Sequence, residues 1–331
     1  MATTYERGPL FSYQGVATFM RARQADFDEL HAGSVAIVGA PLDTTTVWVQ
    51  GARHGPRAIR EGSLHVRYWL DAAPEGELID LETGATIRSN ASGDLVDLGD
   101  LNVYPNQVAR TAESFRAGVR EIVERGALPV ILGGDHYLSL PCCRGAKEGL
   151  EARGQRSIGY LQFGCELGLG GSDPTWGTDY SGAQVRRLMD LDVVAAENVA
   201  WVGPSGLVPR SEYAWARARD GALFTAEDVR RLGAADATRR ALERAAHGCD
   251  GVYVSVGLDV IDSAHAPGVG AAVIGGLHPD ELGEAIGVVA ADPRVVALDV
   301  VEVAPKLDPS GRIQRLAANY ILDFIGPRVL R

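Results

Sequence analysis

Long apolar runs, a disulfide pattern and basic clusters are all missing from this sequence. No stretch approaches the roughly 20 consecutive apolar residues that span a bilayer, so we expect no transmembrane helix. The four cysteines form neither a disulfide framework nor a Cys-x-x-Cys metal motif, which indicates a reducing, cytoplasmic setting. Residues 1–14 lack a basic segment followed by an apolar one, and we therefore expect no signal peptide.

An excess of positive charge is also missing. The chain has 32 Lys and Arg against 43 Asp and Glu, a formal net charge of −11. Nucleic acids and anionic membranes bind clustered Lys and Arg, so neither is an expected partner. The acidic balance mildly favours a cationic ligand. With 331 residues, 46% of them hydrophobic, and no internal repeat or linker, the sequence predicts a single domain over 1–331.

Short apolar runs alternate with longer amphipathic stretches along the chain. Apolar runs rich in β-branched residues indicate strands buried on both faces, as in a parallel sheet. Helices are expected over 107–125, after the capping residue Thr225, and from Pro279 onward. This alternation predicts an α/β fold with a mainly parallel sheet and helices on both faces. The expected strands are 34–39, 95–99, 128–133, 157–163, 199–203, 251–256 and 295–301.

Loops at the ends of four expected strands are candidates for a binding site. They begin at Gly39, Gly133, Gly164 and Gly257. Ligands of open parallel sheets bind just outside the carboxyl ends of the strands. We therefore expect residues from these loops to meet at one edge of the sheet.

Several stretches, spread nearly end to end, resemble the arginase/agmatinase (ureohydrolase) family, and agmatinase more than arginase. The resemblance implies a three-layer α/β/α fold and a homo-oligomer, a trimer or a hexamer. The stretches are Gly-Ala-Pro-Leu-Asp at 39–43, 51–60, 97–100, Gly-Gly-Asp-His within 133–141, 255–270, 275–277 and 299–308.

The family's metal ligands are mostly absent from the matching positions. The family holds two Mn²⁺ ions with Gly-Gly-Asp-His, Asp-Ala-His-x-Asp and Ser-x-Asp-x-Asp motifs. The first is intact, but the second is Gly-Cys-Glu-Leu-Gly at 164–168 and the third Ser-Val-Gly-Leu-Asp at 255–259. Only His136 and Asp259 remain, with Glu166 in place of a His. Glycine has no side-chain donor and Mn²⁺ needs carboxylate and imidazole ligands, so we expect no dinuclear site and no cofactor.

One alternative is a single divalent ion, Mn, Zn or Fe, held by His136, Glu166 and Asp259, because one imidazole and two carboxylates suit such an ion. Otherwise these side chains hydrogen-bond one another around water in a polar pocket. A histidine flanked by carboxylates supplies a general acid–base set. We therefore predict these three residues as the catalytic groups.

Glu302 occupies the position where the family's Glu holds the guanidinium group of the substrate. Charge-assisted hydrogen bonds to a carboxylate suit a cationic nitrogen, so we expect Glu302 to bind one. The alternative is that Glu302 pairs within the protein with Arg53 or Arg57.

Bulky side chains stand where the family has smaller or polar ones. Trp176 replaces a His, Trp48 lies in a loop that usually carries Asn and Arg, and Tyr137 replaces a small residue. They either fill space at the mouth of the pocket or hold a flat, apolar or cationic substrate. We expect Trp176, Trp48 and Tyr137 to bind substrate. Gln162, on the expected strand 157–163, is a further expected substrate-binding residue.

Two neighbours of the expected site have other candidate roles. Cys165 is a candidate nucleophile beside His136. Side chains alternate along a strand, however, so we expect Cys165 to face away from the pocket as a buried thiol. Asp135 is expected to orient the loop that carries His136.

These features favour a repurposed, metal-independent enzyme that applies acid–base chemistry to a small amine- or guanidine-containing metabolite. Two alternatives remain open. One is a non-catalytic subunit that assembles with an active paralogue, and the other is guanidine C–N hydrolysis with a single metal ion.

Overall fold

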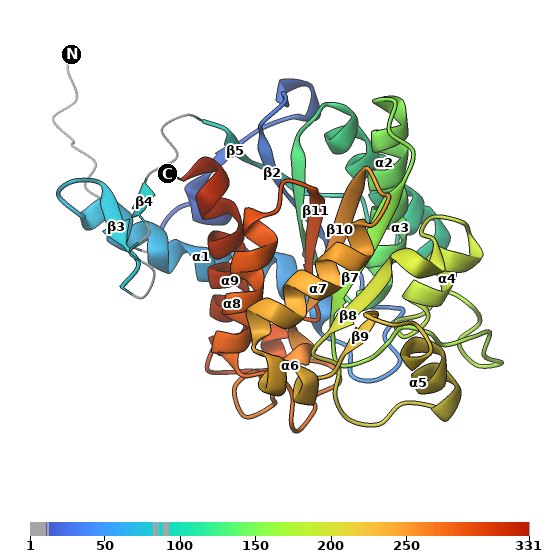
Figure 1. Ribbon diagram of the computed structural model, residues 1–331. Helices are drawn as coiled ribbons and strands as arrows, with labels where there is room; N and C mark the ends of the chain where they lie inside the picture. The colour runs from blue at the N-terminus through green and yellow to red at the C-terminus, as the bar shows by residue number, and fades with distance from the viewer. Residues whose placement is uncertain (1–10, 12, 82–83, 85, 89–92, 331) are drawn as a thin grey trace, which may run out of the picture.

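A single large parallel sheet forms the centre of the protein in the computed structural model, which describes residues 11, 13–81, 84, 86–88 and 93–330 (Figure 1). In these residues nine strands pair in the order β1-β5-β2-β6-β11-β10-β7-β8-β9, and each neighbouring pair is parallel. The strands are β1 (Arg23–Gln24), β2 (Val35–Ala40), β5 (Leu95–Asp100), β6 (Leu128–Gly133), β7 (Ile158–Phe163), β8 (Val199–Val202), β9 (Leu223–Phe224), β10 (Gly251–Gly257) and β11 (Val295–Val301), with a separate antiparallel pair β3 (Glu77–Ile79) and β4 (Thr86–Arg88).

Helices connect the strands and cover both faces of the sheet (Figure 1). Short 3₁₀ turns follow several strands, among them η4 (His136–Leu138) and η6 (Leu258–Val260). The α-helices of the described residues are α1 (Gly55–Ala72), α2 (Val108–Glu124), α3 (Ser139–Ala152), α4 (Gln184–Asp190), α5 (Arg210–Arg217), α6 (Ala226–Leu232), α7 (Ala234–Ala246), α8 (Pro279–Ala291) and α9 (Arg312–Val329).

Two hydrophobic cores, one on each face of the sheet, explain why the strands are apolar throughout. Ile37 and Leu298 pack into the core under α1, α7, α8 and α9, whereas Val38 and Ala297 pack into the core under α2, α3 and α4. Successive side chains of a strand point to opposite faces, so a strand covered on both sides has no polar face. The result is the expected three-layer α/β/α architecture.

The expected elements are confirmed with small shifts at their ends. All seven expected strands are present, and their ends differ from the prediction by at most one residue. Thr225 caps α6 as expected, since its Oγ1 accepts a hydrogen bond of 3.2 Å from the backbone N of Asp228. The two-residue strands β1 and β9 were not predicted, because so short a segment carries no periodicity. No helix among the described residues is both long and apolar enough to cross a bilayer.

Helix α7 approaches the sheet so closely that the facing strand needs a glycine. A Cβ at Gly159 in β7 would lie 1.9 Å from the carbonyl O of Ala245. Both contacting groups are backbone atoms held in regular elements, so neither can move aside easily. Gly159→Ala should therefore lower the free energy of unfolding by about 1–3 kcal/mol, the usual cost of overpacking, or by more. Urea unfolding of Gly159→Ala beside Gly171→Ala, where the new Cβ meets nothing within 4 Å, measures the difference. Equal stability of the two variants would contradict this packing.

Candidate functional site

Four acidic or imidazole side chains from distant parts of the sequence meet at the carboxyl edge of the sheet. His136 follows β6, Glu166 follows β7, Asp259 follows β10 and Glu302 follows β11. These strands are neighbours in the order β6-β11-β10-β7, so their ends lie side by side. The four side chains line one cavity of about 330 Å³, which we call the acidic cavity. The fold therefore brings together four residues that were predicted from the sequence as site residues.

A chain of hydrogen bonds behind His136 sets the orientation of its ring. Nε2 lies 2.9 Å from Ser255 Oγ, which lies 3.1 Å from Ser139 Oγ, and Ser139 donates to Asp299 Oδ2 at 2.7 Å. Tyr253 also donates to this carboxylate, at 2.6 Å. Because the Ser139 proton points to Asp299, Ser255 donates to Ser139 and His136 Nε2–H donates to Ser255. This assignment leaves Nδ1 without a proton, as an acceptor.

Burial keeps the His136 ring neutral. The side chain is 6% exposed, and the loss of water around it lowers its pKa to about 3. Its backbone N donates a hydrogen bond of 2.8 Å to Glu302 Oε1. His136 is therefore a neutral imidazole whose ring is held through Nε2 and whose backbone is held by Glu302.

Cys165 faces the acidic cavity, so our expectation that it points away is wrong. Its Sγ donates to Asp259 Oδ2 at 2.9 Å. Residue 165 lies beyond the end of β7, where the alternation of the strand no longer fixes the direction of side chains. The other oxygen of this carboxylate, Asp259 Oδ1, is buried and has no hydrogen-bond partner within the described residues. Burial raises the pKa of Asp259 to about 6.

Glu302 and Glu166 add two more carboxyl groups to the same cavity. The pKa of Glu302 is raised well above its usual value. Burial is the main cause, and the negative charges of Asp259 and Asp135 add to it. Glu302 is also a non-glycine residue with φ 63°, a conformation that costs energy and that clusters at functional sites. Glu166 is exposed at the cavity rim, yet loss of water around it and the charge of Asp259 raise its pKa to about 7.

No basic side chain among the described lining residues balances these carboxyl groups. The arginines that could have paired with Glu302 have other partners: Arg53 with Asp43 and Arg57 with Glu61. The internal pairing considered for Glu302 is therefore absent. A cavity with three carboxyl groups and no cation of its own is suited to a cationic ligand.

The four other predicted substrate-binding residues divide into one at the cavity and three elsewhere. Trp48 lines the mouth, with 76% of its surface exposed. Tyr137 is 3% exposed and packs into the core under α2 and α3, because η4 turns its side chain away. Trp176 lies in a turn closed by backbone hydrogen bonds between Asp173 and Gly177, and it does not line the cavity.

Gln162 supports the site from behind instead of lining the cavity. Its Nε2 donates to the carbonyl O of Glu166 at 2.8 Å, and its Oε1 accepts from Gln184 Nε2 at 3.3 Å. Gln162 is fully buried in β7. It therefore holds the loop that carries Glu166.

Asp135 holds the His136 loop, as expected. Its Oδ2 accepts hydrogen bonds from Thr45 Oγ1 at 2.6 Å and Thr46 Oγ1 at 3.1 Å, and its Oδ1 accepts from Tyr137 N at 3.2 Å. These bonds tie the loop after β6 to the loop after β2.

Sequence reasoning missed the hydrogen-bonded residues behind His136. One signal was available: Asp299 interrupts an otherwise apolar strand, and a buried carboxylate requires donors. Ser139, Ser255 and Tyr253 supply or extend those donors.

Comparison with known proteins assigns the family. Residues 33–326 match the family model described as the arginase family, and the chain belongs to that family. It is 34% identical to a formimidoylglutamase of Halobacterium salinarum, over 91% of this chain and 89% of the relative. It is 28% identical to a guanidinobutyrase of Pseudomonas aeruginosa, over 95% and 92%. The crystal structure of formimidoylglutamase from Bacillus subtilis superposes with a TM-score of 0.81 at 24% identity, over 98% of this chain and 96% of that one.

Family membership corrects our prediction that the protein uses no cofactor. Enzymes of the arginase family normally hold two manganese ions, and the expectation of a metal-free protein is contradicted by the match to that family.

The side chains in the cavity do not, as placed, fit two metal ions. In the described part of the chain no group of three or more His, Cys, Asp or Glu is arranged to hold a metal ion. A Cβ at Gly257 would lie 2.5 Å from Asp259 Oδ1 and 3.0 Å from His136 Cε1, and one at Gly164 would lie 2.9 Å from His136 Cε1. Side chains at these two positions would therefore require His136 and Asp259 to move.

The hydrogen bonds of His136 predict its protonation. Since burial lowers its pKa to about 3, the ring should stay neutral, with the proton on Nε2, from pH 5 to pH 8. Two-bond ¹H–¹⁵N NMR spectra of the histidine rings report both the charge and the tautomer. Ser255→Ala removes the acceptor of Nε2–H and should alter the His136 signals, whereas Ser310→Ala, remote from the cavity, should leave them unchanged. Protonation of His136 within this pH range would contradict the assignment.

Proposed function

We propose that this protein hydrolyses a C–N bond in the amidino group, guanidino or formimino, of a small nitrogenous metabolite. The observation that carries the proposal is the acidic cavity itself, in which Asp259, Glu166 and Glu302 converge without a Lys or Arg among the described lining residues. An amidinium or guanidinium ion presents several N–H donors in a plane, which suits convergent carboxylates. Relatives named formimidoylglutamase and guanidinobutyrase support this substrate class.

Glu302 anchors the cationic group, with Trp48 at the mouth. Glu302 Oε1 already accepts the backbone N–H of His136 at 2.8 Å, which fixes the carboxylate while its other oxygen remains for the substrate. The indole of Trp48 offers a π face to a cation or a flat group that enters.

Proton transfer falls to Asp259 and Glu166. Asp259 Oδ1 has no partner within the described residues and accepts a proton from the attacking water. Glu166, whose pKa is raised to about 7, donates a proton to the departing nitrogen. A carboxyl group with a pKa near the working pH can both hold and release a proton efficiently. Neutral His136 orients the water through Nδ1.

We also propose that the chain acts in the cytoplasm as a single-domain homo-oligomer, a trimer or a hexamer. The resemblance to the family supports this assembly, and the mass in solution, measured by light scattering, tests it.

Release of urea from guanidino compounds, and of formamide or ammonia from formimino compounds, tests the hydrolysis directly. The assay is run after addition of Mn²⁺ and again after chelation, and turnover in either condition supports the proposal. Saturable binding without turnover in both conditions would support the non-catalytic alternative.

Glu302→Gln removes the negative charge that Glu302 takes on when a cation binds, and it retains an oxygen for the His136 N–H. Loss of a charge-assisted hydrogen bond should lower kcat/KM roughly ten- to hundredfold. Glu61→Gln removes the same charge from a surface pair with Arg57 and serves as the matched control. Equal kcat/KM values for the two variants would exclude Glu302 as the anchor.

The affinity for a cation should depend on pH in a defined direction. Asp259 and Glu166 have pKa values raised to about 6 and about 7, so both are protonated at pH 5 and both are ionised at pH 8. The dissociation constant of a guanidinium ligand should therefore fall at least about tenfold from pH 5 to pH 8. Calorimetric titrations at these two values measure it, and a pH-independent constant would contradict the assigned pKa values.

A further inference from the structure

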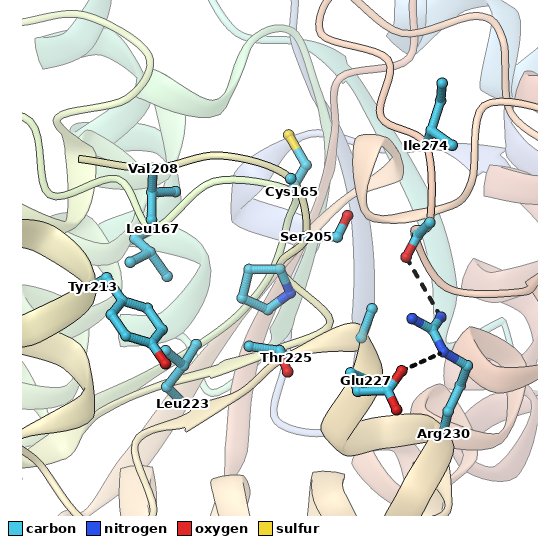
Figure 2. A pocket seen from close by; sticks show the side chains of 14 residues that line it. Cys165, Leu167, Ser205, Val208, Tyr213, Leu223, Thr225, Glu227, Arg230 and Ile274 are labelled. Carbon is cyan, nitrogen blue, oxygen red and sulfur yellow. Dashed lines mark hydrogen bonds and ion pairs between the residues drawn. The ribbon is translucent and has the colours of Figure 1, made fainter. Parts of the chain in front are cut away.

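A second cavity lies beside the acidic cavity and differs from it in character. Its volume is about 310 Å³, at the lower end of the range for small-molecule sites. We call it the side cavity. Figure 2 shows Leu167, Val208, Tyr213 and Leu223 grouped on one side of it. With Pro204 and Ile274 these residues give it a largely apolar lining.

Two small residues are common to the two cavities. Cys165 and Ser205 line both of them, and the backbone N of Ser205 donates to the carbonyl O of Cys165 at 3.3 Å. Ser205 Oγ is buried and has no hydrogen-bond partner within the described residues. A molecule that extends from one cavity to the other would thus pass Cys165 and Ser205, whose hydroxyl group has no partner within the described residues.

The charged groups of the side cavity neutralise each other. Glu227 Oε2 lies 3.3 Å from Arg230 Nε (Figure 2). Arg230 Nη1 lies 3.4 Å from the carbonyl oxygens of Gly275 and Gly276. These are the charged side chains among the described residues that line the side cavity. A carboxylate that entered would compete with Glu227 for Arg230 and would lose water against apolar walls.

We propose that the substrate carries an uncharged, apolar arm beside its amidino group, and that the arm crosses Ser205 and lies in the side cavity. This inference rests on the proposed function, because the amidino group occupies the acidic cavity. It narrows the substrate class to alkyl- or aryl-substituted amidines and guanidines, in contrast to the amino-acid-like compounds suggested by the names of relatives such as guanidinobutyrase.

Binding of a homologous series tests the arm. Calorimetry at pH 8 gives dissociation constants for methyl-, butyl-, hexyl- and octylguanidine with the full chain. Each methylene that enters an apolar cavity should tighten binding by about fourfold. Pentylguanidine should also bind at least tenfold more tightly than 4-guanidinobutyrate, which has similar length but ends in a carboxylate. No gain from butyl to octyl, or tighter binding of the acid, would overturn the proposal.

Val208→Trp fills the side cavity and supplies the matching variant. It should abolish the increase in affinity from butylguanidine to octylguanidine. The affinity for methylguanidine should stay within about twofold, which would show that the acidic cavity is intact. Leu191→Trp adds a large side chain outside both cavities and should keep the full series. If the affinity of Val208→Trp still rose with alkyl chain length as in the unmodified protein, the proposal would be overturned.

Two further results separate the inference from the function on which it rests. A chain-length series without any hydrolysis would support the arm and count against the proposed reaction. Hydrolysis of short guanidines, with no rise in affinity with chain length, would support the proposed reaction and overturn the inference that the substrate carries an apolar arm. If Val208→Trp changes the mass in light scattering while the series persists, the side cavity is a contact between copies of the chain, and the proposal fails.

Discussion

The burial of carboxyl groups around one cavity is the constraint on which the site depends. Asp259 and Glu302 are 5% and 6% exposed, and no basic side chain among the described lining residues offsets their charge. Their raised pKa values mean that the folded chain binds these protons more tightly than the unfolded chain does. The free energy of unfolding therefore falls as the pH rises through these values. A bound cation offsets this loss of stability, because it favours the ionised carboxylates. Ligand affinity and the pH dependence of stability therefore both arise from the buried carboxyl groups.

The long strands and the residues after them could be predicted because both follow from chain periodicity and sheet geometry. A run buried on both faces is apolar throughout, and the carboxyl ends of parallel strands share one edge. His136, Glu166, Asp259 and Glu302 each follow such a strand, so their meeting needed no further information. The directions of single side chains in loops could not be predicted in this way. Tyr137 and Cys165 both leave a strand end, and each faces the side opposite to the one expected.

The metal centre shows how a motif and a family carry different information. The motifs at 164–168 and 255–259 contain glycine where the family has ligands, and His136 and Asp259 lie close to the positions that those side chains would occupy. Sequence alone suggested a protein without a cofactor, whereas the family to which the chain belongs is normally a dimanganese one. Ligand counting describes which donors are present, and it does not by itself establish the chemistry of a site.

The two ends of the sheet have a consequence for how copies of this protein meet. Its outermost strands, β1 and β9, contain two residues each. A long exposed edge strand offers a row of free backbone N–H and C=O groups to another chain, and very short edge strands deny that template. Edges of this kind disfavour any contact in which one sheet continues from one copy of the chain into another. Backbone pairing, which is indifferent to sequence, is thereby withheld from other chains, and recognition of this surface depends on its shape and on the identity of its side chains.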